Sequence, residues 1–289
     1  MFFLQILINS IVLGTQILFI AIPLYLIYSV TKTFHLAIGA TGTALGYFLY
    51  FGISNEWNTL SILGLFVIAA ILLSILSYAL MEPHIRKKQT LLAMLISFAL
   101  GIVIESGISM YFGTDGKIMT KELLPVFHLG DLHITFPGIL IITIGIISAL
   151  LLTLIIKKTP IGRQLRSISE NIHYSESLGV KAQTFRISAY IIASLFAGFS
   201  GVMTGLNTAL TPYMGFHTVI LAFIAFLIGG TTDLRGTIVA SYIIALIPQF
   251  IMSYSTFSSS WKMFFVFIIA AILLILRPHG LFVSNARKS

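Results

Sequence analysis

The stretch FPGILIITIGIISALLLTLIIK, residues 136–157, carries a single charged residue, Lys157, at its very end. A helix rises about 1.5 Å per residue, so about 20 apolar residues cross the roughly 30 Å hydrocarbon core of a bilayer. Because lipid offers no hydrogen bonds, the peptide groups of such a segment must pair within the segment itself. The stretch therefore predicts a membrane-spanning α-helix.

Comparable apolar stretches lie on both sides of this one. Long spans are predicted at 4–30, 58–81, 89–112, 136–157, 184–209, 236–254 and 260–277. Two shorter stretches, 35–53 and 214–230, are interrupted by glycine or threonine. The expected fold is an all-α integral membrane protein with about eight or nine transmembrane segments, two of them short, broken helices.

The composition of the whole chain suits lipid better than water. Asp, Glu, Lys and Arg make up 9% of its 289 residues, against about 25% in a typical soluble domain, and its mean hydropathy is +1.02. The net charge of +8 does not indicate nucleic-acid binding, because the basic residues lie in short loops between apolar runs. The absence of cysteine excludes disulfides and thiolate metal sites. The stretch Met1–Asn9 has no basic residue before its apolar run, so it is expected to be a retained span.

The basic residues also predict the orientation of the chain. Arg86, Lys87 and Lys88 place one loop in the cytoplasm, and the basic segment 157–186 belongs on the same side. The charges of 113–135 nearly balance, which predicts an external loop. With both short stretches counted as crossings, the N-terminus lies outside and the C-terminus lies in the cytoplasm.

The order of long and short spans is the same in the two halves of the chain. Each half reads long, short, long, long, and the two halves start from opposite sides of the membrane, as in an inverted repeat. Nine spans can be divided in several ways, but the matching places of the short stretches favour the repeat. The predicted parts are repeat one at 4–112, the external loop at 113–135, a joining span at 136–157, a cytoplasmic region at 158–183, repeat two at 184–277 and a cytoplasmic tail at 278–289.

The two short stretches form the predicted substrate pathway. Interrupted helices at matching positions are typical of transport sites, because a helix that ends within the membrane presents unpaired amides to a ligand. Packing of helices through small residues is the alternative for any single position. The candidate pathway residues are Gly39, Thr41, Thr43, Met214, Gly215, Phe216 and Thr218.

Glu105 is a weaker candidate for the same pathway. It lies well inside a long span, where a charge costs about 2.5–3.5 kcal/mol at the bilayer centre. We expect it near the outer end of its span, either protonated or facing the bundle interior, with a structural hydrogen bond slightly favoured over substrate contact. His128 and His133 lack the further ligands that a metal site needs, so no metal site is predicted.

The segment 159–179 is expected to form an amphipathic cytoplasmic helix. Thr159 can cap it, Pro160 suits its first turn, and Gly179 can end it. The apolar residues of its predicted face are Ile161, Leu165, Ile168 and Ile172. Such a helix either lies on the membrane surface or docks into a partner, and amphipathicity alone favours the membrane.

The chain has no phosphate-binding G-x-x-x-x-G-K-[ST] motif and no convincing catalytic cluster, so neither ATP hydrolysis nor other enzymatic activity is expected in it. Its second half nevertheless carries an ordered set of motifs. They are Thr159-Pro160-Ile161-Gly162-Arg163-Gln164-Leu165-Arg166, Glu170-Asn171, Leu178-Gly179-Val180, Ala197-Gly198-Phe199-Ser200-Gly201-Val202, Met214-Gly215-Phe216, Gly229-Gly230 and Arg277-Pro278-His279-Gly280-Leu281-Phe282. In this order and spacing the chain closely resembles the permease subunits of ABC importers for branched-chain amino acids, with related permeases for urea and short amides.

This resemblance implies partners and a location. A permease of this kind pairs with a second, similar permease and is driven by two cytoplasmic ATPase subunits that bind ATP and Mg²⁺. An extracytoplasmic binding protein delivers the substrate, and the assembly lies in the cytoplasmic (inner) membrane of a prokaryote. By the same resemblance, 158–183 becomes the region that couples to the ATPase, rather than a surface helix. The coupling residues it implies are Gly162, Arg163, Arg166, Glu170 and Gly179.

The chain departs from the family pattern in the predicted pathway. Ile38 and Ala40 stand where relatives carry a His and a Glu, and Leu221 stands where many carry a Lys. The departures leave the cargo open between branched-chain or other small apolar amino acids, and urea, short amides or another small metabolite. A secondary transporter is the alternative outside the family, with Glu105 and Asp233 as the acidic candidates for ion coupling.

Overall fold

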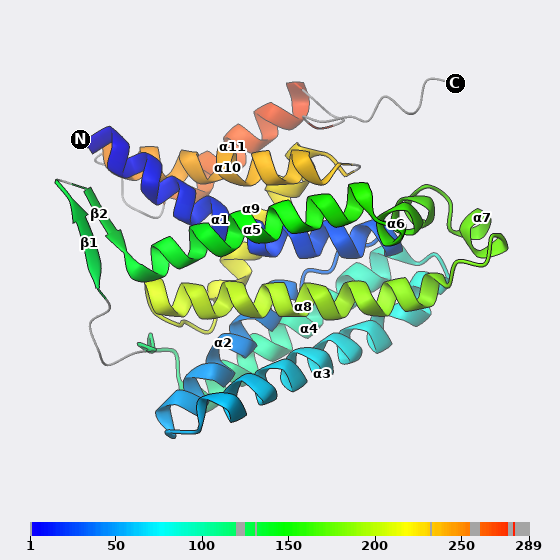
Figure 1. Cartoon of the computed structure of the whole chain (residues 1–289), viewed down its shortest axis with the longest axis horizontal. Coiled ribbons are helices and arrows are strands. Elements are labelled where there is room, and N and C mark those ends of the chain that lie inside the picture. The colour runs from blue at the N-terminus through cyan, green and yellow to red at the C-terminus, as the bar shows by residue number, and fades with distance from the viewer. Residues whose placement is uncertain are drawn as a thin grey trace.

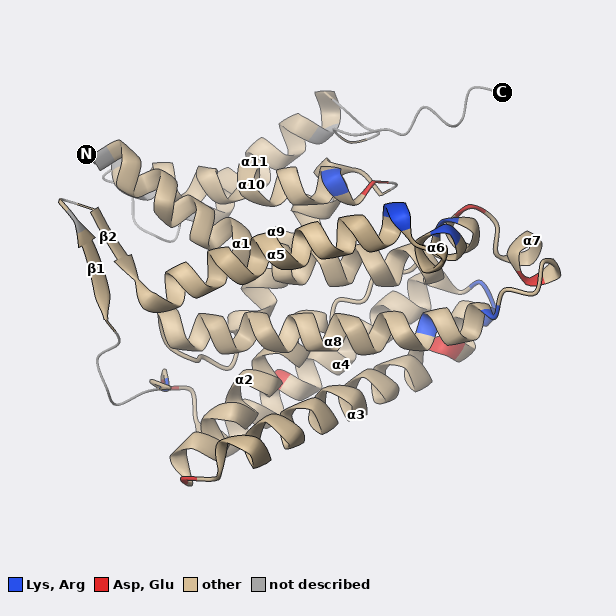
Figure 2. Cartoon of the chain, in the orientation of Figure 1, with Lys and Arg blue, Asp and Glu red and all other residues tan. Residues whose placement is uncertain are grey.

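The computed structural model describes residues 2–119, 125–130, 132–231, 233–254, 261–276 and 280. The helices run largely side by side along the long axis of the molecule (Figure 1). The strands β1 and β2 lie at one end of the bundle and the short helices α6 and α7 at the other (Figure 1). Most charged residues also lie toward the helix ends, as a bilayer around the middle of the bundle requires (Figure 2).

Eleven helices and two strands are formed in this described part of the chain. The elements are α1 (Phe2–Thr31), α2 (Ile38–Ser54), α3 (Thr59–Arg86), α4 (Thr90–Phe112), β1 (Val126–Leu129), β2 (Leu132–Thr135), α5 (Phe136–Lys158), α6 (Pro160–Glu170), α7 (Ile172–Ser177), α8 (Ala182–Asn207), α9 (Met214–Gly229), α10 (Leu234–Tyr254) and α11 (Trp261–Leu276). The expected all-α membrane fold is confirmed, with a short β1–β2 hairpin added in the described residues.

Six of the described helices are long and apolar enough to cross a membrane, rather than the predicted seven. These are α1, α3, α4, α5, α8 and α10. The predicted long span at 260–277 is described between Trp261 and Leu276, where it forms the 16-residue α11. The predicted span 58–81 is shorter than the helix that forms there. Helix α3 continues through Pro83 and ends at Arg86, five residues beyond the predicted boundary at residue 81.

The predicted external loop 113–135 contains ordered backbone pairing. Within it, β1 and β2 form an antiparallel hairpin in which Val126 pairs with Thr135. Gln5, at the start of α1, exchanges two hydrogen bonds of 2.9 Å with the backbone of His133 in β2. The start of α1 and the hairpin are therefore held at the same end of the bundle.

Side-chain caps explain several helix starts. The hydroxyl of Thr135 accepts a hydrogen bond from Gly138 N at 3.1 Å and begins α5, in which Pro137 lies in the first turn. The carboxamide oxygen of Asn58 accepts from Leu60 N in the same way and begins α3. Because these capping signals are local, the sequence already indicates where such helices start.

Corresponding helices pack in the same way in the two halves. In the first half α2 contacts α3 and α4, and in the second half α9 contacts α10 and α11. Between the halves, α1 packs on α9 and α10 while α8 packs on α2 and α3. These contacts match between α1–α4 and α8–α11, and the predicted internal repeat stays a prediction. Most of α1 is buried at the centre, whereas α3 is largely exposed at the periphery.

Candidate functional site

The two short helices meet at their N-termini. A Cβ atom added to Gly39 in α2 would collide with the carbonyl oxygen of Gly215 in α9. A Cβ atom on Gly215 would collide in turn with the carbonyl oxygen of Gly39. Glycine at both positions lets the two backbones touch, so the first turns of both short helices lie together inside the bundle. Two predicted pathway residues, 176 positions apart, are brought into direct contact.

The gap beside this contact is narrow. It holds about 10 Å³, and its walls include the predicted residues Thr43, Met214 and Thr218 as well as the two glycines. The hydroxyl groups of Thr43 and Thr218 donate to carbonyl oxygens four residues earlier in their own helices, at 3.3 and 3.0 Å. Two of the predicted pathway threonines therefore line a tightly closed seam rather than an open channel.

Thr41 lies apart from this seam. It is fully buried, and its hydroxyl donates to the carbonyl oxygen of Ala37 at 3.0 Å. Thr41 lines neither this seam nor the larger cavity between α2, α4 and α9. A short polar residue of this kind satisfies its hydroxyl on its own helix and packs closely. Its position fits the helix-packing alternative.

Glu105 joins α4 to the first turn of α9. Its Oε1 accepts a hydrogen bond of 3.1 Å from the backbone N–H of Phe216, and the residue is 6% exposed. The first N–H groups of a helix lack partners within the helix and carry partial positive charge, so a carboxylate there is stabilised. Glu105 thus makes a hydrogen bond inside the bundle, and its acceptor role at α9 explains how the side chain is tolerated there.

A cavity of about 170 Å³ opens beside Glu105, between α2, α4 and α9. Apart from the Glu105 carboxylate its walls are apolar, and they include three aromatic rings. Ala40, which stands where the family pattern has Glu, also lines this cavity. The lining residues are Leu36, Ala40, Phe98, Gly101, Ile102, Glu105, Phe216, Val219, Ile220 and Phe223.

The segment 159–179, predicted to be one cytoplasmic helix, forms two helices. Thr159 caps α6 as predicted, by accepting from Gly162 N at 3.2 Å. The helix stops at Asn171, whose carboxamide oxygen accepts from Tyr174 N at 3.1 Å and begins α7. Asparagine offers the backbone an alternative to continuing the helix, which explains the break. Gly179, with φ of +84°, ends the element as predicted.

The predicted coupling residues divide into two kinds. Arg163, Arg166 and Glu170 line an open cavity of about 330 Å³, whose other lining residues also come from α6, α7 and the Asn171 between them. Gly162 instead packs against α5, where an added Cβ would collide with the carbonyl oxygen of Ile156. Ile161, predicted on the apolar face, is mainly exposed, whereas Ile168 is buried. The charged residues are thus presented at the surface, and the two glycines shape the backbone that presents them.

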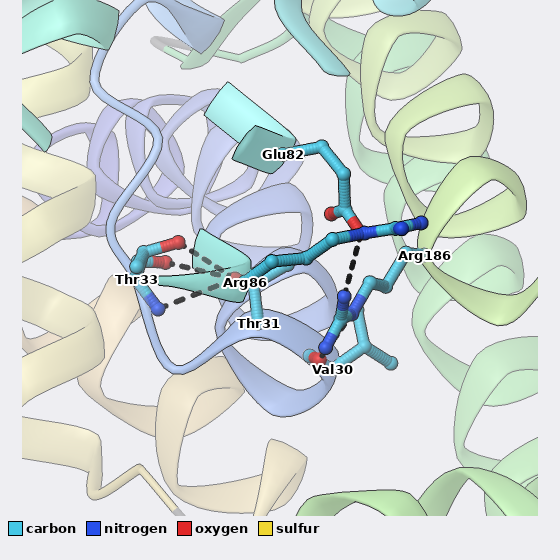
Figure 3. A network of polar contacts seen from close by, with 6 residues as sticks. All are labelled: Val30, Thr31, Thr33, Glu82, Arg86 and Arg186. Atoms are coloured by element: carbon cyan, nitrogen blue, oxygen red, sulfur yellow. Dashed lines mark hydrogen bonds and ion pairs between the residues drawn. The ribbon is translucent and has the colours of Figure 1, made fainter. Parts of the chain in front are cut away.

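A buried ion pair that the sequence did not predict lies near the end of the bundle that carries α6 and α7. Glu82 Oε1 accepts from Arg186 Nη1 at 2.7 Å and from Arg86 Nε at 2.8 Å (Figure 3). Arg186 Nε also donates to the carbonyl oxygen of Val30 at 3.4 Å. The contacts join α3, α8 and the end of α1. An acidic residue directly after a long apolar run was the available signal, but the predicted span stopped at residue 81.

Among the described residues, no group of three or more His, Asp or Glu side chains could hold a metal ion. His128 and His133 pair across the hairpin, with their Nδ1 atoms 2.6 Å apart, on the exposed surface.

Comparison with known proteins matches residues 6–276 to the family model described as the branched-chain amino acid transport system / permease component. The chain belongs to this family. Among curated relatives, a probable branched-chain amino acid transport permease protein, LivH, of Methanocaldococcus jannaschii is 26% identical over 94% of this chain and 90% of its own length. The high-affinity LivH permease of Escherichia coli K12 is 22% identical over 97% of this chain and 96% of its own.

A solved ABC transporter in an inward-facing conformation shares the fold with this branched-chain family member. It has a TM-score of 0.53 and 12% identity, and the match covers 94% of this chain and 85% of that one. Membership of the family and the apolar helices together make this chain a multi-pass membrane permease rather than an enzyme. The resemblance drawn from the sequence motifs is confirmed.

Proposed function

We propose that this chain is one permease subunit of an ABC importer and forms half of a pathway for branched-chain or other small apolar amino acids. The observation that carries the proposal is the meeting of two short helices, α2 and α9, at Gly39 and Gly215, beside a mainly apolar cavity. Half-helices that end inside the membrane are the usual builders of transport sites. An apolar cavity of this size suits a small apolar side chain.

The partners in this proposal are a second homologous permease, two cytoplasmic ATPase subunits and an extracytoplasmic binding protein. The ATPases, with ATP and Mg²⁺, dock on the surface formed by Arg163, Arg166 and Glu170. The assembly lies in the inner membrane of a prokaryote, with the C-terminus in the cytoplasm. The predicted tail 278–289 lies outside the described residues, apart from Gly280.

The secondary-transporter alternative is weakened by the surroundings of Asp233. A carboxylate that couples transport to protons must gain and lose its proton during the cycle. Asp233 Oδ2 forms an ion pair with Arg235 Nη2 at 2.9 Å. Burial raises the pKa of Asp233, but the hydrogen bonds and charge of Arg235 outweigh it and leave this pKa below its ordinary value. Of the two acidic candidates, only Glu105 then remains.

ATP-dependent uptake tests the proposed function. The chain is reconstituted in liposomes with the second permease, the binding protein and the ATPase subunits, and uptake is measured for labelled leucine, isoleucine, valine, urea and acetamide. We expect ATP-dependent accumulation of the amino acids. If only urea or acetamide accumulates, the substrate is urea or a short amide, as in the related permeases. Accumulation without ATPase subunits would contradict the importer assignment.

Substitution at the two glycines of the cytoplasmic element tests the coupling assignment. Gly162→Leu displaces α6 from the end of α5, and Gly179→Leu strains a backbone with positive φ. We expect each variant to insert normally and to lose at least about tenfold in uptake. The control is Gly64→Leu in α3, where no atom lies within 4 Å of an added Cβ. Normal uptake by the Gly162 and Gly179 variants would refute the coupling role.

A further inference from the structure

The Glu105 carboxylate has one partner on the protein and faces a cavity. Its Oε1 is held by the backbone N–H of Phe216. In the described part of the chain, no ion pair with Lys or Arg and no second hydrogen bond is formed by this carboxylate. An ionised carboxylate within a bundle is costly unless it meets a compensating charge. The helix N-terminus supplies part of that compensation, and a cationic ligand would supply the rest.

The walls of the cavity beside Glu105 indicate which further chemical groups such a ligand has. Phe98, Phe216 and Phe223 contribute aromatic surface to it, and the remaining walls are aliphatic. Phe98, Ile102 and Phe216 are each more than one-third exposed, so the cavity opens at the face formed by α4 and α9. A hydrocarbon chain alone would leave the carboxylate without a partner, and a sugar or an amide would leave its several polar groups facing apolar walls. A small ammonium compound with an apolar substituent satisfies both parts of the cavity.

We propose that this cavity binds the transported amino acid, with its ammonium group on Glu105 and its apolar side chain against Phe98, Phe216 and Phe223. The carboxylate of the amino acid then points out of the apolar cavity, toward its open face at α4 and α9. The proposal rests on the proposed import of apolar amino acids and names the subsite that recognises them. Glu105 is then a substrate-binding residue as well as the cap of α9. Because the two roles need different parts of the side chain, substitution can separate them.

The decisive pair of variants is Glu105→Gln and Glu105→Ala. Glutamine keeps a carbonyl oxygen that accepts from Phe216 N but removes the charge, whereas alanine removes both. Binding of labelled L-leucine is measured by scintillation proximity on the purified permease–ATPase complex without binding protein. We expect Glu105→Gln to weaken leucine binding about 10- to 100-fold, the factor that a charge-assisted hydrogen bond contributes. The control is Asp115→Asn, which removes an exposed carboxylate outside the membrane.

Competition by 4-methyl-2-hydroxypentanoate, which carries a hydroxyl in place of the ammonium group of leucine, reports on the contact itself. On the wild-type complex this hydroxy acid should compete at least about tenfold more weakly than leucine. On the Glu105→Gln complex the difference should largely disappear, an effect that loss of a helix cap does not produce. Ile102→Trp, which narrows the cavity from a half-exposed position, should weaken leucine binding more than alanine binding.

The outcomes separate this proposal from the proposed function. If wild-type proteoliposomes accumulate leucine with ATP but Glu105→Gln binds leucine normally and keeps the preference over the hydroxy acid, the subsite is refuted and the import function stands. The subsite is also refuted if only Glu105→Ala loses binding, because the residue would then act as a cap. If wild-type proteoliposomes do not accumulate leucine, the import function fails, and the subsite that rests on it fails too.

Discussion

At the scale of single residues, glycine decides where the two short helices can meet. Gly39 and Gly215 each occupy a place where the other helix leaves no room for a side chain. The threonines beside them turn their hydroxyls back to their own helices and add no repulsion between the backbones. Close approach of backbones through small residues is the usual basis of helix packing in lipid, where no hydrophobic force draws helices together.

A valine at either glycine should separate the two helices. Overpacking of a tight interior costs about 1–3 kcal/mol, and here the obstructing atoms are backbone atoms that cannot rotate away. We expect Gly39→Val and Gly215→Val to lower the unfolding temperature of the purified protein by several degrees and to abolish uptake. Gly107→Val in α4, where an added Cβ meets nothing within 4 Å, should leave both unchanged. Wild-type stability in the first two variants would contradict the assigned contact.

At the scale of the elements, the ends of the helices carry most of the specific polar interactions. The break between α6 and α7 at Asn171 lets this pair of short helices turn away from the bundle and present its charged residues. At the same end of the molecule, α3 extends past its apolar run so that Glu82 can reach the first turns of α8 (Figure 3). These contacts join the three helices α1, α3 and α8 at that end of the bundle.

Loss of the Glu82 carboxylate should destabilise this junction. The side chain of Glu82 is 7% exposed and that of Arg186 is 13% exposed, so Glu82→Ala leaves a largely buried arginine without its partner. Breaking such a pair costs about 3–5 kcal/mol. Arg235→Ala removes an ion pair whose arginine is 55% exposed, so water screens the pair and its loss should lower stability far less. The free energy of unfolding of both variants is measured in mixed micelles. Equal losses of stability would contradict the structural role assigned to Glu82.

At the scale of the whole molecule, the arrangement places two kinds of surface at opposite ends. The hairpin and the α2–α3 junction lie at one end, and α6 and α7 lie at the other (Figure 1). Between these ends the apolar helices form the membrane-embedded part, with the short helices α2 and α9 meeting inside it. An ABC permease needs two different ends, because substrate enters at one side of the membrane and ATPase subunits act at the other.

The absence of native cysteine makes this orientation easy to test. Asn55→Cys lies at the α2–α3 junction, and Ser177→Cys lies at the end of α7; both native residues are exposed. A membrane-impermeant maleimide should label Asn55→Cys in intact cells and Ser177→Cys only after the membrane is opened. The reverse labelling pattern would invert the proposed orientation.

The sequence by itself determined that the chain lives in lipid, where most of its helices begin and end, and which family it belongs to. Those properties are local, since apolar length, capping residues and motif spacing act within one segment. Only the tertiary structure decided that Gly39 meets Gly215, that Glu105 caps α9 and that Glu82 pairs with Arg186 across 104 positions. Each of these contacts joins different helices, and in lipid the partner of a helix face is selected by shape and by the few polar groups that need one another. Such complementarity exists between surfaces, so no single segment reveals it.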